Sequence, residues 1–416
     1  MSGFKKASKP SDALVGIDFG TTKICVVVGH IKGGELEIVG IGKQPSHGIR
    51  KGVVVNIPTT VEALKKAVEV AELMAGTEIS SAYSGIAGGH IKGFNSTGVV
   101  AIKNTEVTEQ DVDRAIDAAK AVAIPLDREI IHVIPQEFTV NDQEGVKDPI
   151  GMSGVRLESK VHIVTGAISS AQNIIKCANQ SGVNVNDIVL EPLASAEAVL
   201  TPDEKELGVA VVDIGGGTTD IAIFVRGSVV HTGVIAMGGN HITNDIAVGL
   251  RASIQEAENI KINSGCAMTS MLGADEMIEV PAVGGRPARE VSKSILTKII
   301  EPRVEEIFSL VSQEIINSGY KHLLSSGVVI TGGASLLDGM SELGEFILEM
   351  PVRRGYPQGF GGLNDVVSSP IYATAVGLLK YGMQNQTETR FNVREENSNA
   401  YAKIVNRMKA WLGEVF

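Results

Sequence analysis

The chain has 416 residues, 44% of them hydrophobic and 20% charged, with a formal net charge of −11. These values are typical of a soluble globular protein with roughly two to four structural units, and the acidity excludes a general nucleic-acid binder. Cys25, Cys177 and Cys266 are far apart and form no C-x-x-C pair, so we expect a reducing compartment without disulfides or a zinc site. We find neither a signal peptide nor the ~20 consecutive apolar residues that span a bilayer.

The first motif is a Gly-Thr-Thr turn between two apolar strands, after a leader over residues 1–12 that we expect to be disordered. Residues 14–23 read L-V-G-I-D-F-G-T-T-K, so an apolar strand runs into a carboxylate and then into the turn. The turn offers a ligand Asp18, Gly20, Thr21 and Thr22. The elements expected in this region are strands over 14–18, 23–28 and 36–41 and a helix over 59–74.

Residues 84–164 differ in character and predict a small inserted β-α-β-β subdomain. Thr108 is expected to begin a helix as its N-cap, with Asp111 three residues later in a pattern close to a capping box. The elements expected are a strand over 98–102, a helix over 108–123, a strand over 129–140 that Pro135 interrupts, a loop over 141–154 and a strand over 155–164.

A strand-to-helix junction at Glu191 follows a helix predicted over 169–181. The strand is expected over 187–190, and the helix over 191–198 consists of small residues that allow close packing. A side chain at such a junction can face a cleft. A solvated cap residue is an equally good interpretation of Glu191 from the sequence alone.

The stretch with the most chemistry is residues 209–220, V-A-V-V-D-I-G-G-G-T-T-D. The apolar run predicts a buried strand, and the glycines that follow expose backbone N–H groups, which form an anion-binding nest. Asp213 and Asp220 would repel a phosphate unless a hard cation such as Mg²⁺ lies between them. One such motif is equally compatible with a plain hairpin turn. Because the motif near Asp18 is a second copy, we predict a duplicated architecture with both hairpins facing one cleft.

Two further helices are predicted in the second half of the chain, one with a pair of opposite charges and one that is long and amphipathic. Glu258 and Lys261 are three residues apart on a helix predicted over 253–263, and a surface ion pair is the alternative interpretation. Residues 292–318 predict a long amphipathic helix that Pro302 is expected to kink. Its apolar side is expected to consist of Ile295, Ile299, Val304, Ile307 and Val311.

A strand over 327–331 runs into Gly332-Gly333-Ala334, where bare backbone is open to a flat ligand such as a purine. A second helix of small residues is predicted over 371–381, after a proline start at Ser369-Pro370. The remaining elements expected are a strand over 228–235, a helix over 240–250 and a hairpin made of residues 277–283 and 286–291.

The end of the chain combines a polar linker with an amphipathic helix. Residues 384–400 have few apolar side chains and predict a flexible linker. Over 401–416 an apolar face opposes basic residues, as in helices that lie in a membrane interface. A helix that packs on the body or on a partner is the alternative, which the linker disfavours. The apolar face comprises Tyr401, Ile404, Val405, Met408, Trp411, Leu412 and Val415, and the basic residues are Lys403, Arg407 and Lys409.

The two Asp-Gly-Thr-Thr hairpins, the Gly-Gly-Ala turn and the two small-residue helices resemble the actin, Hsp70 and sugar-kinase superfamily of ATP-binding proteins over residues 14–383. The resemblance implies an α/β fold: an actin-like, two-lobed ATPase fold with duplicated phosphate-hairpin subdomains and an inserted small α+β subdomain. Within the superfamily the sequence is similar to the bacterial FtsA family. The segments D-F-G-T-T-K, D-I-G-G-G-T-T-D, A-E-N-I-K and I-E-P-R carry this similarity, together with the insert and the amphipathic tail.

By this resemblance the cleft binds ATP and Mg²⁺. Asp18 and Asp213 would position the metal through waters, and Glu191 matches the carboxylate that orients the attacking water in related filament proteins, with at most weak hydrolysis. The residues that the resemblance assigns to the nucleotide are Asp18, Gly20, Thr21, Thr22, Lys23, Asp213, Gly215, Gly216, Gly217, Thr218, Thr219, Glu258, Lys261, Gly332, Gly333 and Ala334.

The FtsA family polymerises, tethers the FtsZ ring to the inner face of the cytoplasmic membrane and helps to recruit later division proteins at the septum. The resemblance implies a contact of Arg303 with the FtsZ C-terminal tail, later partners at residues 84–164, self-association and anionic lipids, but no nucleic acid. The alternatives are a pilus-assembly relative, which usually lacks the terminal helix, and a sugar kinase or phosphatase of the superfamily. An Hsp70-type chaperone is disfavoured, because no peptide-binding β domain follows the body.

The resemblance also predicts where the subdomains begin and end. They are 1A (residues 1–83, 165–205 and a C-terminal helix over 366–383), 1C (84–164), 2A (206–242 and 303–365), 2B (243–302), a flexible linker (384–400) and a membrane-targeting helix (401–416).

Overall fold

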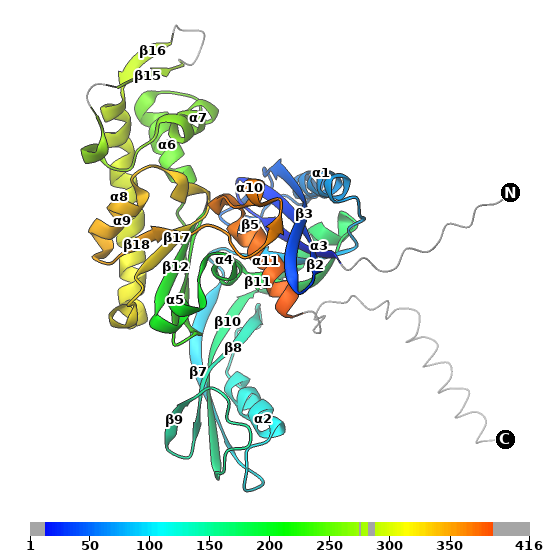
Figure 1. The fold of residues 1–416 in the computed structure, drawn as a ribbon. Coiled ribbons are helices and arrows are strands. Elements are labelled where there is room, and N and C mark those ends of the chain that lie inside the picture. Colours follow the sequence, from blue (N-terminus) through cyan, green and yellow to red (C-terminus); the bar gives the residue numbers. More distant parts are fainter. Residues whose placement is uncertain (1–12, 274–275, 282–287, 386–416) are drawn as a thin grey trace, which may run out of the picture.

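The structure, a computed structural model, describes residues 13–273, 276–281 and 288–385. Two lobes stand side by side, each built around its own sheet, and a smaller third unit extends from the junction between them (Figure 1). The predicted leader, the tip of the hairpin predicted around residues 284–285, the linker from residue 386 onward and the terminal helix lie outside the described residues.

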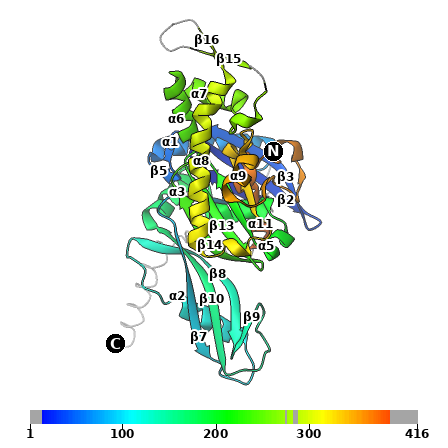
Figure 2. The same cartoon turned by 90° about the vertical axis from the view of Figure 1, so that its left-hand side faces the viewer.

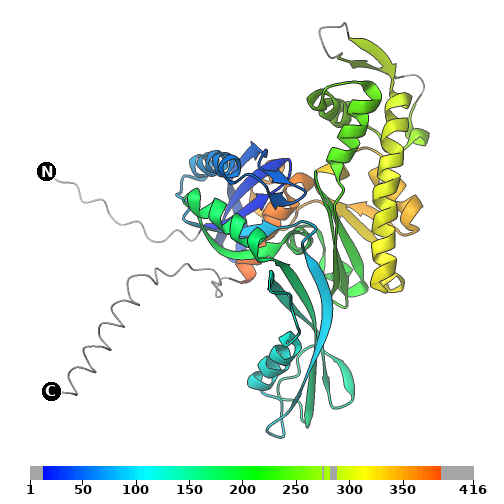
Figure 3. The ribbon, with the colours of Figure 1, turned by 180° about the vertical axis from the view of Figure 1, so that it is seen from behind.

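The first lobe is a mixed sheet with helices on both faces. Strands β1, β2 and β3 form an antiparallel meander, and β6 runs parallel to β1. Helices α1 and α3 cover the outer face, as the view from behind shows (Figure 3). In sheet order the strands are β11 (Asn184–Leu190), β6 (Ser81–Ile86), β1 (Ala13–Phe19), β2 (Lys23–Lys32), β3 (Glu35–Pro45) and β19 (Gly361–Gly362), and the helices are α1 (Ile57–Ala75) and α3 (Ile168–Gln180).

The second lobe repeats this topology, which confirms the predicted duplication. Its β12, β13 and β14 form an antiparallel meander, and β17 runs parallel to β12 just as β6 runs parallel to β1. In sheet order the strands are β14 (Ser228–Ile235), β13 (Thr219–Val225), β12 (Val209–Ile214), β17 (Val328–Thr331) and β18 (Val352–Arg354), and the helices are α5 (Pro202–Leu207), α6 (Gly239–Leu250), α7 (Ile254–Ser264), α8 (Lys293–Ser318) and α9 (Met340–Leu348).

The two small-residue helices, α4 (Glu191–Val199) and α11 (Ala373–Gln384), form the layer between the two sheets. One buried cluster joins Ala194, Ala196 and Ala198 of α4 to Ala375 and other residues of α11 and to side chains of both sheets. A short 3-10 turn, Pro370–Tyr372, precedes α11, so the helix begins after the predicted proline start. Small side chains bring the two helices close together and thereby bring the lobes together.

The inserted unit is a separate sheet with one helix against it. Its strands lie in the order β7-β10-β8-β9 below the lobes in Figure 2. The predicted capping box of Thr108 and Asp111 is confirmed at the start of the helix. The elements are β7 (Lys92–Ala101), α2 (Glu109–Lys120), β8 (Arg128–Val140), β9 (Gln143–Val146) and β10 (Arg156–Ala167), and small peripheral elements elsewhere are β4 (Ile49–Arg50), β5 (Val53–Val54), β15 (Met277–Val280), β16 (Arg289–Ser292) and α10 (Asn364–Val367).

Two details of the inserted unit differ from the prediction. Pro135 does not interrupt its strand, because the register against β10 shifts next to it, and prolines are tolerated at such irregularities. The predicted loop over 141–154 contains β9, which pairs back onto β8. Its sequence Q-E-G-V has no apolar alternation, so only the pairing with a neighbouring strand reveals it as a strand.

The predicted apolar side of α8 is partly wrong. Ile295 is 51% exposed, whereas Leu296 and Ile300 are buried together with Val304, Ile307 and Val311. Ile299 is half-buried and packs against the core, so of the predicted residues only Ile295 lies outside the apolar side, which Leu296 and Ile300 extend. None of the described helices is long and apolar enough to cross a membrane.

A buried polar network joins the inserted unit to the second lobe. His162 on β10 contacts the Oδ1 of Asn95 through Nδ1 at 2.8 Å and the Oγ1 of Thr232 on β14 through Nε2 at 2.9 Å. Gln136 on β8 donates to the backbone oxygen of Val229 at 2.9 Å. Burial, reinforced by the nearby His231, lowers the pKa of His162 to about 4. The imidazole is therefore neutral in the folded protein at physiological pH.

We expect this histidine to make the fold sensitive to acid. Because its pKa is lower in the folded chain than the ordinary 6.5, the unfolded chain takes up a proton first as the pH falls. Stability from this residue is fully present above pH 6.5 and is lost toward pH 4, by about 3 kcal/mol in total. Urea unfolding of wild type and His162→Gln between pH 7 and 5 measures it. His162→Gln should lose less free energy of unfolding between pH 7 and 5 than wild type. The control His322→Gln, at an exposed position, should lose as much as wild type. Equal losses in all three proteins would contradict the assignment.

Candidate functional site

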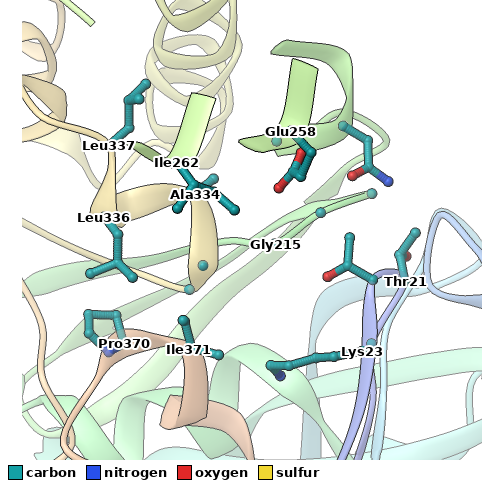
Figure 4. A pocket seen from close by; sticks show the side chains of 18 of the residues that line it. Thr21, Lys23, Gly215, Glu258, Ile262, Ala334, Leu336, Leu337, Pro370 and Ile371 are labelled. Atoms are coloured by element: carbon teal, nitrogen blue, oxygen red, sulfur yellow. The ribbon is translucent and has the colours of Figure 1, made fainter. Parts of the chain in front are cut away.

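A cavity of about 490 Å³ lies between the two lobes. The two glycine-rich turns, α7, the turn after β17 and the start of α11 all contribute to its wall (Figure 4). All but one of the predicted nucleotide-site residues line this cavity, and Glu191 lines it too. The predicted residues in the lining are Asp18, Gly20, Thr21, Thr22, Lys23, Glu191, Asp213, Gly215, Gly216, Gly217, Thr218, Glu258, Lys261, Gly332, Gly333 and Ala334.

The exception is Thr219. Its side chain is fully buried, and its hydroxyl donates a hydrogen bond to the backbone oxygen of Met237 at 2.9 Å. The hydroxyl therefore fixes the chain that leads from β14 toward α6. The Gly-Thr-Thr pattern does not distinguish the two threonines. Their positions in the folded hairpin decide that Thr218 lines the cavity and that Thr219 is buried.

The two glycine-rich turns meet tip to tip. A Cβ atom on Gly216 would lie 2.4 Å from the Cγ2 of Thr22, and one on Gly217 would lie 2.6 Å from the Oγ1 of Thr21. No side chain fits between the turns at these distances. The turns therefore present their backbones and threonines to the same space, which is what the prediction of two hairpins facing one cleft requires.

Carboxyl groups gather at the inner end of the cavity. Asp18 is paired with Lys23, whose Nζ lies 2.5 Å from its Oδ2. Burial, followed by the charges of Asp18, Asp220 and Asp213, raises the pKa of Glu191 well above its ordinary value. Burial also raises the pKa of Asp213, and it raises that of Asp220 to about 7 despite a hydrogen bond from Thr218. The acids outweigh the paired ammonium, so this end of the cavity favours a cation.

The residues present fit a cation that is held through water and phosphate. The buried Oδ1 atom of Asp220 has no hydrogen-bond partner in the described part of the chain. Among the described residues no group of three His, Cys, Asp or Glu side chains is arranged to hold a metal ion directly. Mg²⁺ usually keeps several of its waters and takes one or two carboxylates besides phosphate oxygens, so it does not need such a group.

Glu258 and Lys261 are part of the cavity wall and not a surface ion pair. The Nζ of Lys261 lies 2.7 Å from the Oε2 of Glu258 and 2.8 Å from the Oγ1 of Thr243, and it donates to the backbone oxygen of Gly239 at 3.2 Å. The lysine side chain is only 12% exposed. These bonds tie α7 to α6 and hold the Glu258 carboxylate at the cavity.

The outer part of the cavity has an apolar wall that the sequence did not predict. Figure 4 shows side chains from three separated segments around it. Pro370 and Ile371, just before α11, lie beside the turn that follows β17. The sequence predicted Pro370 and Ile371 only as the start of a helix, and only the tertiary structure brings the three segments together. The wall residues are Ile262, Leu336, Leu337, Pro370 and Ile371.

Arg303 lies away from this cavity, near the middle of α8. Its guanidinium bonds Asp245 of α6 through two nitrogens, with the Nε 2.6 Å and the second 3.1 Å from the carboxylate oxygens. Glu306 accepts a further hydrogen bond from the same group. An acidic peptide would therefore reach Arg303 by sharing or replacing partners that it already has. The predicted membrane residues lie outside the described part of the chain.

Comparisons with known proteins agree on one family. Two family models match the chain: "Cell division protein FtsA" over residues 210–377 and "SHS2 domain inserted in FTSA" over residues 88–165. The cell division protein FtsA of Pseudomonas aeruginosa is 50% identical over 404 residues, which cover 96% of this chain and 97% of that protein. FtsA of Escherichia coli K12 is 40% identical over 411 residues, which cover 97% of this chain and 98% of that protein.

The chain belongs to the FtsA family of cell-division proteins. Similarity to solved structures shows that this chain has an actin-like fold. A chain of the PilM-PilN type IV pilus biogenesis complex superposes with a TM-score of 0.65 at 14% identity, covering 89% of this chain and 98% of that one. MreB5 of Spiroplasma citri bound to ADP gives a TM-score of 0.56 at 15% identity, covering 90% and 97%. The predicted fold class is thus confirmed, and the identity to FtsA proteins decides against the pilus-assembly and sugar-kinase alternatives.

Proposed function

We propose that this member of the FtsA family binds Mg·ATP in the cavity between its lobes. The observation that carries the proposal is the pair of Gly-Thr-Thr turns that meet tip to tip beside buried carboxyl groups. Backbone N–H groups and hydroxyls in such turns bind phosphates, and the acidic inner end suits the accompanying cation. The distant structural neighbours MreB5 bound to ADP and MreB5 bound to AMPPNP support an adenine nucleotide.

The proposed roles follow the position of each residue along the cavity. The two turns hold the phosphates, with Lys23 countering their charge, and the apolar wall with Gly332, Gly333 and Ala334 receives the purine. Glu258 and Lys261 face the ribose and base. Asp18 and Asp213 orient the waters of Mg²⁺, which when bound neutralises charge on the phosphates.

Glu191 is the proposed residue that orients the attacking water. Burial and the neighbouring carboxylates raise its pKa well above the ordinary value, so the group holds its proton more tightly and is a weaker base without a cation. A bound cation would lower this pKa and make the carboxylate available. Weak hydrolysis, dependent on Mg²⁺, is the activity that such a residue supports.

We propose the remaining features from membership of the FtsA family. The protein polymerises on the cytoplasmic face of the membrane at the division septum and tethers FtsZ through its C-terminal helix, and residues 84–164 contact later division proteins. Filament formation by the structural neighbour titled "MamK double helical filament" supports self-association of this fold. The SHS2 match over residues 88–165 supports a boundary of the insert close to the proposed one, and we propose the other subdomain boundaries as given above.

Co-sedimentation with anionic liposomes tests the tether. The full chain is expected to pellet with vesicles and to carry purified FtsZ down with it, whereas a chain ending at Asn399 should stay in the supernatant. Trp411→Glu should do nearly the same, because a charge in the apolar face opposes insertion into the interface. The experiment compares each protein with and without Mg·ATP.

Matched controls separate the parts of this proposal. Lys65→Ala, at an exposed position of α1 outside the cavity lining and far in the sequence from the tail, should pellet like wild type. Arg303→Ala should still pellet, with less FtsZ carried down if the proposed contact is correct. Full liposome binding by Trp411→Glu would show that the apolar face is assigned wrongly, and binding by the shortened chain would remove the tail from the tether altogether.

A further inference from the structure

We propose that Ser195 and Thr374 are positioning residues of the cation site, because their hydroxyls both hold the same oxygen of the Asp213 carboxylate. The proposal rests on the proposed Mg·ATP site and goes beyond it, since neither residue belongs to the two glycine-rich turns. Ser195 comes from α4 and Thr374 from α11, so the site on the second sheet is completed by the helix pair between the lobes.

The contacts form a closed triangle of buried oxygen atoms. The Oγ of Ser195 donates to the Oδ2 of Asp213 at 2.5 Å, and the Oγ1 of Thr374 donates to the same atom at 3.2 Å. The two hydroxyl oxygens lie 3.1 Å from each other. Ser195 is fully buried, and Asp213 and Thr374 are less than a tenth exposed. Hydrogen bonds to an ionised acceptor in such surroundings are short and comparatively strong.

A third contact blocks the other way in which the carboxylate could turn. A Cβ atom on Gly332 would lie 2.3 Å from the Oδ1 of Asp213 and 2.6 Å from the backbone oxygen of Ile214. The φ of Gly332 is +83°, in the region that favours glycine. The backbone of the turn after β17 therefore passes directly beside Oδ1. With Oδ2 held by hydroxyls, Oδ1 is the oxygen left for the waters of a cation.

The helix pair that carries the hydroxyls is itself tightly placed. A Cβ atom on Gly377 of α11 would lie 1.7 Å from the backbone oxygen of Ala194 of α4, and one on Gly16 of β1 would lie 2.6 Å from the oxygen of Ala375. The two hydroxyls therefore belong to helices whose backbones are in close contact with each other, and α11 is also in close contact with β1 of the first sheet. Partners of this kind orient the groups that hold a metal, here through its waters, and removal of such partners typically weakens metal affinity about 10- to 100-fold.

The test removes each hydroxyl with little change of shape. In Ser195→Ala and Thr374→Val we expect the Mg²⁺ concentration for half-maximal binding of a fluorescent ATP analogue to rise at least about tenfold. Binding of the same analogue in EDTA should stay within about twofold of wild type. Thr374→Ser keeps the hydroxyl and should restore the wild-type Mg²⁺ requirement, which a merely structural role of this position would not predict.

Two outcomes would overturn the proposal, and they are distinguishable. A wild-type Mg²⁺ requirement in both Ser195→Ala and Thr374→Val would show that the hydroxyls do not position the site, while the Mg·ATP proposal would stand. A wild-type chain whose affinity for the analogue is the same in Mg²⁺ and in EDTA would overturn the cation site and this inference with it. Thermal unfolding of each protein without ligand establishes that the variants are folded, and Thr374→Val alone decides the question if Ser195→Ala does not fold.

Discussion

Replacing Gly377 with alanine is expected to disrupt the packing between the lobes. The new methyl group would lie 1.7 Å from the backbone oxygen of Ala194, and no side chain can move aside to make room. The helices α4 and α11 would have to separate by more than an ångström, which would open the cluster they share with both sheets. Overpacking of a core costs typically about 1–3 kcal/mol and occasionally more, and we place this change at about 3 kcal/mol or above.

Helix propensity and overpacking predict opposite changes in stability for Gly377→Ala, so the direction of the change distinguishes them. Alanine ordinarily stabilises a helix over glycine by roughly 0.5–1 kcal/mol, so helix propensity alone predicts a gain. We expect the midpoint of thermal unfolding to fall by roughly 3 °C or more instead. Gly89→Ala is the matched control, because a Cβ atom there meets nothing within 4 Å and its φ is not positive. An unchanged midpoint in Gly377→Ala would contradict the close crossing of the two helices.

Replacing Asp213 with alanine is expected to remove most of the Mg²⁺-dependent affinity for ATP, on the order of a 100-fold loss. The change deletes a carboxylate that faces the cavity, and it leaves the hydroxyls of Ser195 and Thr374 without their acceptor. Isothermal titration with ATP in Mg²⁺ and in EDTA separates the metal-dependent affinity from the rest. Liposome binding should be unaffected, because the proposed membrane residues are far away in the sequence.

Two variants sharpen the interpretation of that result. Asp213→Asn keeps the shape and loses only the charge, so it should lose nearly as much Mg²⁺-dependent affinity as the alanine variant. Glu191→Gln should retain Mg·ATP binding and lose hydrolysis, since this residue is proposed to act on water and not on the nucleotide. If Asp213→Asn bound Mg·ATP as tightly as wild type, the charge of Asp213 would have no part in the site.

Local patterns predicted much of the fold and most of the candidate site. Each glycine-rich turn and its flanking strands form a contiguous stretch of the chain. An apolar run that ends in Asp-Gly-Thr-Thr therefore predicts the strand, the turn and the residues at the tip of the turn. The capping box at Thr108 is equally local and was also predicted. Where the prediction erred, as at Ile295 and β9, a neighbouring element and not the segment itself set the outcome.

The sequence by itself determined the duplicated hairpins, the small-residue helices and the resemblance to the FtsA family, because each of these features depends on residues that are adjacent in the chain. Only the tertiary structure decided that Ser195 and Thr374 meet at Asp213, that Pro370 lies beside the turn that carries Leu336, and that Arg303 is already paired with Asp245. Ser195 and Thr374 are 179 residues apart in the chain. Contacts over such separations arise from the packing of whole sheets and helices, and no spacing of residue types within a segment encodes them.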